Sequence, residues 1–218
     1  MDEPYDSRLT NSLEEAIGIA QVLGCDIAKV SMDLKRPRPI GASRFHPEIM
    51  DQLKIFTGLL KAAAPRAEAA GVKLAVENHT DAFSTEVLWV LDEVDHPFVG
   101  ACVDTVNGLH VTEDPIVAVE NLAPRSFTNH FRDNRIEITH DGFRLTGTAV
   151  GEGDLDMQRA YEIIRDQSAM NRINIELDMD VLSDDPAEAR RHEREAVERS
   201  IRFCREVLGI QRVQAGGI

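Results

Sequence analysis

Short apolar runs alternate along the chain with longer stretches in which apolar residues recur every three or four positions. The short runs are rich in Val, Ile, Leu, Phe and Ala, which is typical of buried parallel strands. They cover residues 26–32, 72–77, 99–104, 126–130 and 172–176. The longer stretches predict helices at 13–23, 48–70, 84–91, 115–122, 156–168 and 185–208. Regular alternation of strands and helices predicts an α/β protein built on a parallel sheet.

Local signals set the ends of several elements. Ser12 and Glu15 have the spacing of a capping box at the start of the first helix, and Ser84 is expected to cap a later one. Pro65 is expected to kink or divide the helix at 48–70. The pair Asp141-Gly142 separates two alternating runs within residues 136–146, which predicts a β-hairpin.

Four of the strands end in residue types that bind metals: Glu77, Asp104, His130 and Glu176. The intervals between the first three match a βαβ unit of roughly 30 residues, and the inserted hairpin lengthens the last one. Connections of the same hand bring all four strand ends to one edge of the sheet. Three carboxylates buried together need a cation, because otherwise they must repel or take up protons. We therefore predict a divalent-metal site, with Mn²⁺ or Mg²⁺ favoured and Co²⁺ or Zn²⁺ as alternatives.

Charge and cysteine content narrow the class of protein. The net charge of −14 argues against nucleic acid or an anionic membrane as a partner, since both require a basic surface. The three cysteines form no motif, which suits a reducing compartment. The first residues are polar and acidic, unlike a signal peptide, so we expect a cytoplasmic protein.

The strand-end motifs resemble an ordered set found in the xylose isomerase-like TIM-barrel superfamily, in its sugar (phosphate) isomerase/epimerase branch that includes the ketose 3-epimerases. The set comprises residues 76–79, 104–107, 130–133, 151–154 and 175–176. The resemblance implies that Glu77, Asp104, His130 and Glu176 bind one metal, typically Mn²⁺. It also implies that Glu77 and Glu176 are the catalytic acid/base pair, exchanging a proton with the sugar through an enediolate.

Other positions are candidates for contacts with the substrate: Asn107, Arg132, His79, Arg44 and His46. Asn107 stands where these epimerases often have a histidine, and Arg132 where a lysine is common. A surface ion pair is an equal alternative for Arg132, as is a capping or packing role for His79. Arg44 and His46 belong to a basic loop rich in proline and glycine at 33–47, which is suited to an anionic substrate group.

The resemblance also implies a gap at the start of the barrel. The five predicted strands match the fourth to the eighth of a (β/α)₈ barrel, so the first three βα units are missing. Residues 1–218 are accordingly expected to form a single incomplete (β/α) barrel domain. An open sheet exposes its edges, and we expect a homo-oligomer or a partner chain that completes the barrel.

Three functions are compatible with the predicted metal site and fold. The first is a metal-dependent sugar isomerase or epimerase with a small sugar or sugar derivative as substrate. The second is a keto-sugar lyase or dehydratase of the inosose or 3-keto-glycoside type, which needs the same metal and the same first proton abstraction. The third is a non-catalytic barrel subunit. An abasic-site endonuclease shares the fold family, but the acidic net charge argues against it.

Overall fold

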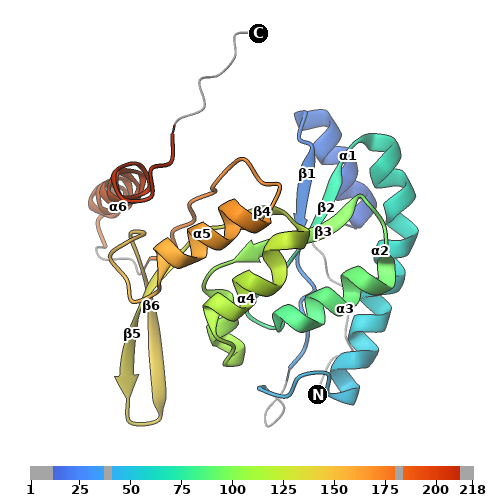
Figure 1. Cartoon of the computed structure of the whole chain (residues 1–218), viewed down its shortest axis with the longest axis horizontal. Helices are drawn as coiled ribbons and strands as arrows, with labels where there is room; N and C mark the ends of the chain where they lie inside the picture. The colour runs from blue at the N-terminus through green and yellow to red at the C-terminus, as the bar shows by residue number, and fades with distance from the viewer. Residues whose placement is uncertain (1–11, 37–40, 180–183, 212–218) are drawn as a thin grey trace. The chain divides into compact units, whose positions relative to one another are not determined.

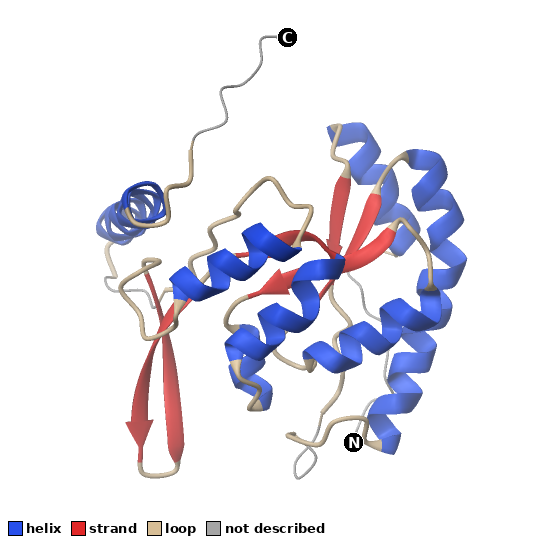
Figure 2. Cartoon of the chain, in the orientation of Figure 1, coloured by secondary structure: helices blue, strands red, loops and turns tan. Residues whose placement is uncertain are grey.

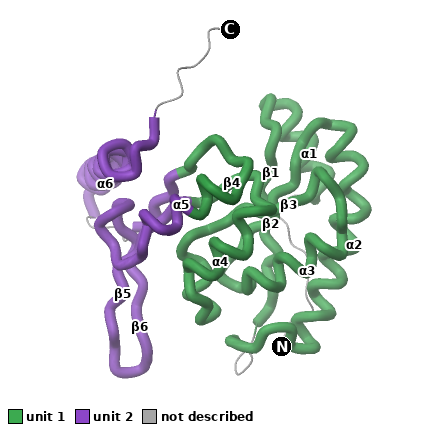
Figure 3. Tube along the Cα trace, viewed as in Figure 1, with its two compact units in different colours: residues 1–130, 163–174 green, residues 131–162, 175–218 purple. Residues whose placement is uncertain are grey.

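The computed structural model describes residues 12–36, 41–179 and 184–211 (Figure 1). The expectations for the first eleven residues, and for residues 37–40 of the basic loop, lie outside these ranges. The chain divides into two compact units, which are coloured separately in Figure 3. The first contains residues up to His130 together with Ile163–Asn174, and the second contains Phe131–Glu162 and the residues from Ile175 onward. Each unit is described by itself.

A four-stranded parallel sheet forms the centre of the first unit, in the order β1-β2-β3-β4 (Figure 2). Its strands are β1 (Ile27–Val30), β2 (Lys73–Glu77), β3 (Val99–Asp104) and β4 (Ser126–His130). The helices are α1 (Leu13–Leu23), α2 (Pro47–Ala70), α3 (Ser84–Val94) and α4 (Pro115–Leu122), with short 3₁₀ helices at Asn107–Val111 and Ala123–Arg125. Strand order follows chain order, and neighbouring helices pack on one another in the same order. The predicted parallel α/β architecture is confirmed.

The core of this unit lies between the sheet and its helices. Every residue of β3 is buried, as expected for a strand covered on both faces. Leu53, Phe56 and Leu60 of α2 are at most 1 % exposed. Burial of apolar side chains such as these stabilises the unit by roughly 25 cal/mol for each Å² of apolar surface removed from water.

Helix boundaries agree with the sequence in most places. Ser12 and Glu15 form the predicted capping box, in which each side chain accepts a hydrogen bond from the other's backbone N–H. Pro65 does not divide α2, which runs unbroken for 24 residues. The missing N–H costs one helical hydrogen bond, and burial of the neighbouring Ala63, Ala64 and Ala67 holds the helix on the core.

The start of α3 differs from the prediction. Ser84 is the first helical residue rather than the cap, which is Phe83. The Ser84 backbone N–H and hydroxyl both donate to the carboxylate of Glu113, at 2.8 and 2.9 Å. Glu113 thus satisfies an N–H group that the helix leaves without a partner, and it comes from a distant part of the chain that no local pattern indicates.

The fifth predicted strand, at 172–176, is reduced to an isolated parallel bridge between Phe131 and Ile175. Side-chain amides replace the backbone ladder next to it. The Asn174 N–H donates to Asn129 Oδ1 at 3.0 Å, Asn129 Nδ2 donates to the Arg172 carbonyl at 2.8 Å, and Asn174 Nδ2 donates to Thr128 Oγ1 at 2.7 Å. The segment therefore follows the edge of β4 without the regular pairing of a strand.

The second unit contains the predicted hairpin, formed by β5 (Asp133–Thr139) and β6 (Gly142–Thr148), and the helix α6 (Pro186–Glu206). Helix α5 (Met157–Gln167) contributes residues to both units. Thr139 pairs with Gly142, so the turn is His140-Asp141, one residue earlier than predicted. Gly142 begins β6 with a φ of 147°, a conformation that favours glycine.

No helix within the described ranges has both the length and the apolar character needed to cross a bilayer.

Candidate metal centre

Three of the predicted ligands are the last residues of neighbouring strands. Glu77 ends β2, Asp104 ends β3 and His130 ends β4. Because the strands are parallel, these ends meet at one edge of the sheet, and Asp104 is the direct register partner of His130. One potential ligand atom from each residue lies within 4.8 Å of the others.

Both carboxylate oxygens of Glu77 accept hydrogen bonds, although the side chain is only 2 % exposed. Oε1 lies 2.9 Å from His130 Nδ1 and accepts from Asn107 Nδ2 at 3.3 Å. Oε2 accepts from Lys29 Nζ at 2.8 Å and from Ser31 Oγ at 3.2 Å. Burial raises the pKa of Glu77, but the hydrogen bonds and charges of His130 and Lys29 outweigh it and lower the pKa to about 2. Glu77 is therefore an anion at neutral pH.

Asp104 is fully buried and held by backbone groups. Its Oδ1 accepts from the N–H groups of Val106 and Asn107, both at 2.8 Å. Its Oδ2 lies 3.8 Å from His130 Nδ1. These bonds fix the side-chain rotamer, so that one oxygen is held by the loop that follows and the other faces His130.

The buried amide of Asn78 joins the ends of β2 and β3. Its Oδ1 accepts from the Asp104 N–H at 2.7 Å, and its Nδ2 donates to the Asp104 carbonyl at 3.0 Å. Asn78 directly follows Glu77, so one side chain fixes the spacing between two of the predicted ligands. No local pattern points to this role of Asn78, although the residue lies inside the motif at 76–79.

The donor set fits a divalent cation. Two buried carboxylates and one imidazole offer oxygen and nitrogen atoms, a set that suits Mn²⁺ or Mg²⁺ and that Co²⁺ and Zn²⁺ also accept. Clustering two buried anions is unfavourable without a positive charge between them. The residues present therefore fit the group that the sequence predicts.

Glu176, the fourth predicted ligand, belongs to the second unit. Its backbone N–H donates to the carbonyl of Phe131 at 3.3 Å, and Phe131 directly follows His130 in the chain. The segment carrying Glu176 thus pairs with the residue that continues β4. The role of its carboxylate as a ligand remains a prediction.

The candidate substrate residues have different surroundings. Asn107 is buried at the start of a 3₁₀ helix and contacts Glu77. His79 Nδ1 lies 3.5 Å from Asp81 Oδ1, and the hydrogen bond with Asp81 raises the pKa of His79. Arg132 belongs to the second unit, where its guanidinium lies 3.4 Å from Asp178 Oδ2.

Arg44 and His46 hold the basic loop in place. The Arg44 guanidinium lies 3.2 Å from Glu113 and stacks over the ring of Phe83 at 4.6 Å. His46 precedes α2 and its Nδ1 accepts from the Glu48 N–H at 3.4 Å, which makes it the helix cap. The partners of these two residues are thus Glu113, Phe83 and the first turn of α2.

The glycine-rich turn at 151–154 surrounds a carboxylate of the chain itself. The N–H groups of Gly151 and Gly153 both donate to Asp133 Oδ2 at 2.9 Å. A Cβ at Gly153 would lie 2.1 Å from Asp133 Oδ1, so only glycine fits there. Burial raises the pKa of Asp133 despite these backbone hydrogen bonds. The turn is shaped to hold Asp133.

Comparison with known proteins identifies the fold family. The family model described as "Xylose isomerase-like TIM barrel" matches residues 2–207. The chain belongs to this family. Among solved structures, it is similar to another xylose isomerase-like TIM barrel protein, from Mycobacterium smegmatis, in complex with magnesium. That likeness has a TM-score of 0.63 and 14 % identity, covering 85 % of this chain and 65 % of the other.

Two further relatives have more specific names. A sugar phosphate isomerase/epimerase from Parabacteroides distasonis has a TM-score of 0.65 and 16 % identity, covering 91 % of this chain and 64 % of that one. The 3-oxo-isoapionate decarboxylase of Pectobacterium atrosepticum is 27 % identical over 137 residues, which is 62 % of this chain and 49 % of the decarboxylase. This member of the xylose isomerase-like family thus spans about half the length of that curated relative.

Truncation of Asn78 should weaken both the fold and metal binding. Asn78→Ala removes two hydrogen bonds to the buried backbone of Asp104, so we expect a loss of about 2–3 kcal/mol in the free energy of unfolding. Mn²⁺ affinity should also fall, because Glu77 and Asp104 lose their fixed spacing. Denaturant unfolding and calorimetric titration measure the two effects.

The matched control is Asn121→Ala. Asn121 belongs to α4, and its amide donates to Ser84 Oγ of α3 at 2.8 Å. This variant should lose some stability and keep its Mn²⁺ affinity. Equal Mn²⁺ affinity for Asn78→Ala and the wild-type chain would show that Asn78 has no part in spacing the ligands.

Proposed function

We propose that this protein is a divalent-metal-dependent sugar isomerase or epimerase that acts by proton abstraction and an enediolate intermediate. The observation that carries the proposal is the convergence of Glu77, Asp104 and His130 at the ends of three adjacent parallel strands. Parallel α/β proteins build their sites at this edge. The family of the chain supports a sugar-modifying activity.

In this proposal Glu176 completes the ligand set and shares acid/base work with Glu77. One glutamate takes the proton from the carbon next to the substrate carbonyl, leaving an enediolate. An epimerase returns a proton to the opposite face of that carbon from the other glutamate, whereas an isomerase returns it to the neighbouring carbon while a hydroxyl proton passes between the two oxygens. A positioned carboxylate is the usual base for such a step. A bound divalent cation would supply Lewis-acid stabilisation for the oxygen that gains charge.

Other side chains are proposed to orient the hydroxyl groups of the substrate. They are Asn107, Arg132 and His79, with Arg44 and His46 as more remote candidates.

Mn²⁺ is the proposed metal, with Mg²⁺, Co²⁺ and Zn²⁺ as alternatives. The oxygen-rich donor set supports a hard cation, and the Mycobacterium smegmatis relative was solved with magnesium. The cytoplasm is the proposed location, on the basis of the strongly acidic charge and the scattered free cysteines.

A keto-sugar lyase is the second candidate. The 27 % identity to 3-oxo-isoapionate decarboxylase specifically favours it. Loss of CO₂ from a keto acid, loss of water from an inosose and cleavage of a 3-keto-glycoside with loss of its glycosidic alcohol also pass through an enolate. A bound divalent cation would stabilise this enolate, and a carboxylic acid would protonate it. The two candidates share the site and differ in which bond breaks.

The test is a panel of ketoses, keto-glycosides and sugar 3-keto acids incubated with the chain and Mn²⁺ in D₂O. An isomerase or epimerase should incorporate deuterium at a carbon next to the carbonyl and form an isomeric product, both detected by NMR. A lyase should release CO₂, water or the alcohol of the glycoside, together with a shortened or unsaturated sugar product. Absence of both exchange and product, without bound metal, would support a non-catalytic barrel subunit instead.

We further propose that the two units form one incomplete barrel domain. The family model covers both of them without a break, from residue 2 to residue 207. A homo-oligomer, or a partner chain that completes the barrel, would then cover the open side of the sheet. Light scattering after size-exclusion chromatography tests this, and a stable monomer with full activity would contradict it.

A further inference from the structure

Lys29 places a positive charge directly on a predicted metal ligand. It is the third residue of β1, within the otherwise apolar strand Ile27–Val30. Its Nζ lies 2.8 Å from Glu77 Oε2 and 3.1 Å from Ser31 Oγ, and Ser31 Oγ also donates to Glu77 Oε2. The other oxygen of Glu77 faces His130 and Asn107. The Lys29 ammonium is thus the positive charge paired with the carboxylate on the side away from His130.

An ammonium group and a divalent cation compete for the same anion. A cation bound to Glu77 would lie ~2.1 Å from a carboxylate oxygen. An ammonium that stays 2.8 Å from Oε2 would then be close to it, where repulsion between like charges is strong even at an effective dielectric constant of about 20. The pairing of Lys29 with Glu77 therefore opposes metal binding unless the ammonium moves.

The surroundings of Lys29 allow that movement. Its side chain is 39 % exposed, whereas that of Glu77 is 2 % exposed. Lys29 and His130 both line a cavity of about 430 Å³ in the first unit, together with Asp26, Thr128, Asn171 and Arg172. A lysine side chain is long and flexible, so the ammonium can leave Glu77 for this water-accessible space while its stem stays in β1.

We propose that Lys29 is a built-in counter-ion of Glu77 whose positive charge opposes an incoming divalent cation, so that Lys29 lowers the affinity of the metal centre. This inference rests on the metal site of the proposed function. Removal of Lys29 should therefore change the metal affinity in the opposite direction to removal of a residue that merely orients Glu77. Loss of an orienting residue weakens metal binding, whereas loss of a competing charge strengthens it.

The test compares Mn²⁺ binding by calorimetry and by electron paramagnetic resonance in four chelator-treated proteins: wild type, Lys29→Met, Lys29→Arg and Lys54→Met. Lys29→Met should bind Mn²⁺ about tenfold more tightly or better, because a competing unit charge is gone. Lys29→Arg keeps the charge and should stay within about threefold of the wild type. Chelator-treated Lys29→Met should also melt at a lower temperature, since buried Glu77 loses its ion pair.

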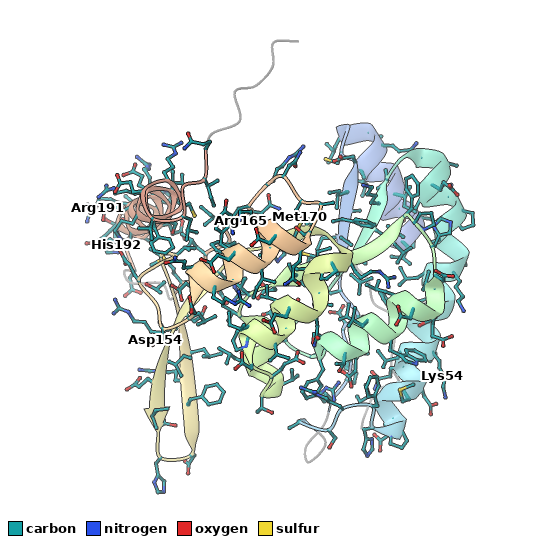
Figure 4. All side chains as sticks on the ribbon, viewed as in Figure 1. Lys54, Asp154, Arg165, Met170, Arg191 and His192 are labelled. Atoms are coloured by element: carbon teal, nitrogen blue, oxygen red, sulfur yellow. The ribbon has the colours of Figure 1, made fainter. Side chains whose placement is uncertain are left out.

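Lys54→Met is the matched control for charge. Lys54 is labelled on α2 in Figure 4, where it is 63 % exposed and lies 3.3 Å from Asp51. Its removal changes the net charge by the same amount and should leave Mn²⁺ affinity and melting temperature unchanged. Lys29→Gln, which retains a polar end, serves as a second variant in case Lys29→Met does not fold.

The possible outcomes separate this inference from the function it rests on. Tighter Mn²⁺ binding by Lys29→Met or Lys29→Gln, with Lys29→Arg and Lys54→Met unchanged, supports the inference. Weaker or equal binding by the Lys29 variants, in a wild-type chain that does bind Mn²⁺, overturns the counter-ion role and leaves the metal centre standing. A wild-type chain that binds no Mn²⁺ overturns the metal centre itself, and the counter-ion role with it.

Discussion

Glu176→Gln is expected to abolish the exchange of substrate protons with solvent. The substitution keeps the shape of the side chain and removes its ability to accept a proton at neutral pH. General acid–base groups contribute about 10²–10⁴-fold to rate, so we expect a loss of deuterium incorporation of that size. The reaction is followed by NMR in D₂O, at a Mn²⁺ concentration that saturates the variant.

Glu188→Gln provides the control for this variant. Glu188 lies on α6 in the same unit as Glu176, where it pairs with Arg191 at 3.2 Å. The Glu188→Gln variant should exchange substrate protons with solvent at the wild-type rate. Turnover of Glu176→Gln at that rate under saturating Mn²⁺ would remove Glu176 from the mechanism.

Asp104→Asn is expected to lower Mn²⁺ affinity on the order of 100-fold or more, since one of the anionic ligands becomes a neutral amide. The amide oxygen can still accept from the Val106 and Asn107 N–H groups, so the local fold should persist. Relief of repulsion with Glu77 should leave the chelator-treated variant at least as stable as the wild type. Calorimetric titration and thermal melting measure both effects.

Asp114→Asn is the matched substitution outside the site. Asp114 caps α4 through hydrogen bonds from Ile116 and Val117, and asparagine caps a helix equally well. This variant should keep its Mn²⁺ affinity and its melting temperature. Undiminished Mn²⁺ binding by Asp104→Asn would exclude Asp104 from the ligand set.

The sequence predicts the four strands of the sheet, their parallel order and three of the converging polar side chains because each depends on a local pattern. An apolar run followed by Glu77 or Asp104 marks both a strand and its end, and the regular spacing places those ends together. Capping is predictable where both partners are near in sequence, as with Ser12 and Glu15. The hydrogen bond from the Ser84 N–H to Glu113 at the start of α3 cannot be predicted in this way, because the two residues are 29 positions apart in the sequence.

Contacts between distant residues account for the other differences. Asn129 and Asn174 exchange side-chain hydrogen bonds where a regular fifth strand is predicted. The tertiary burial of α2 overrides the local preference of Pro65 to end a helix. Lys29 is the single charged residue of β1, but its pairing with Glu77 requires the register between β1 and β2.

The most direct test of the metal centre is a crystal structure of the chain grown with Mn²⁺ and measured at the manganese absorption edge. We predict one anomalous peak per chain at ~2.1 Å from carboxylate oxygens of Glu77 and Asp104 and from a ring nitrogen of His130. A fourth contact from Glu176 would complete the predicted set. An ordered cluster with no peak between these three side chains, or a peak held elsewhere on the molecule, would contradict the account.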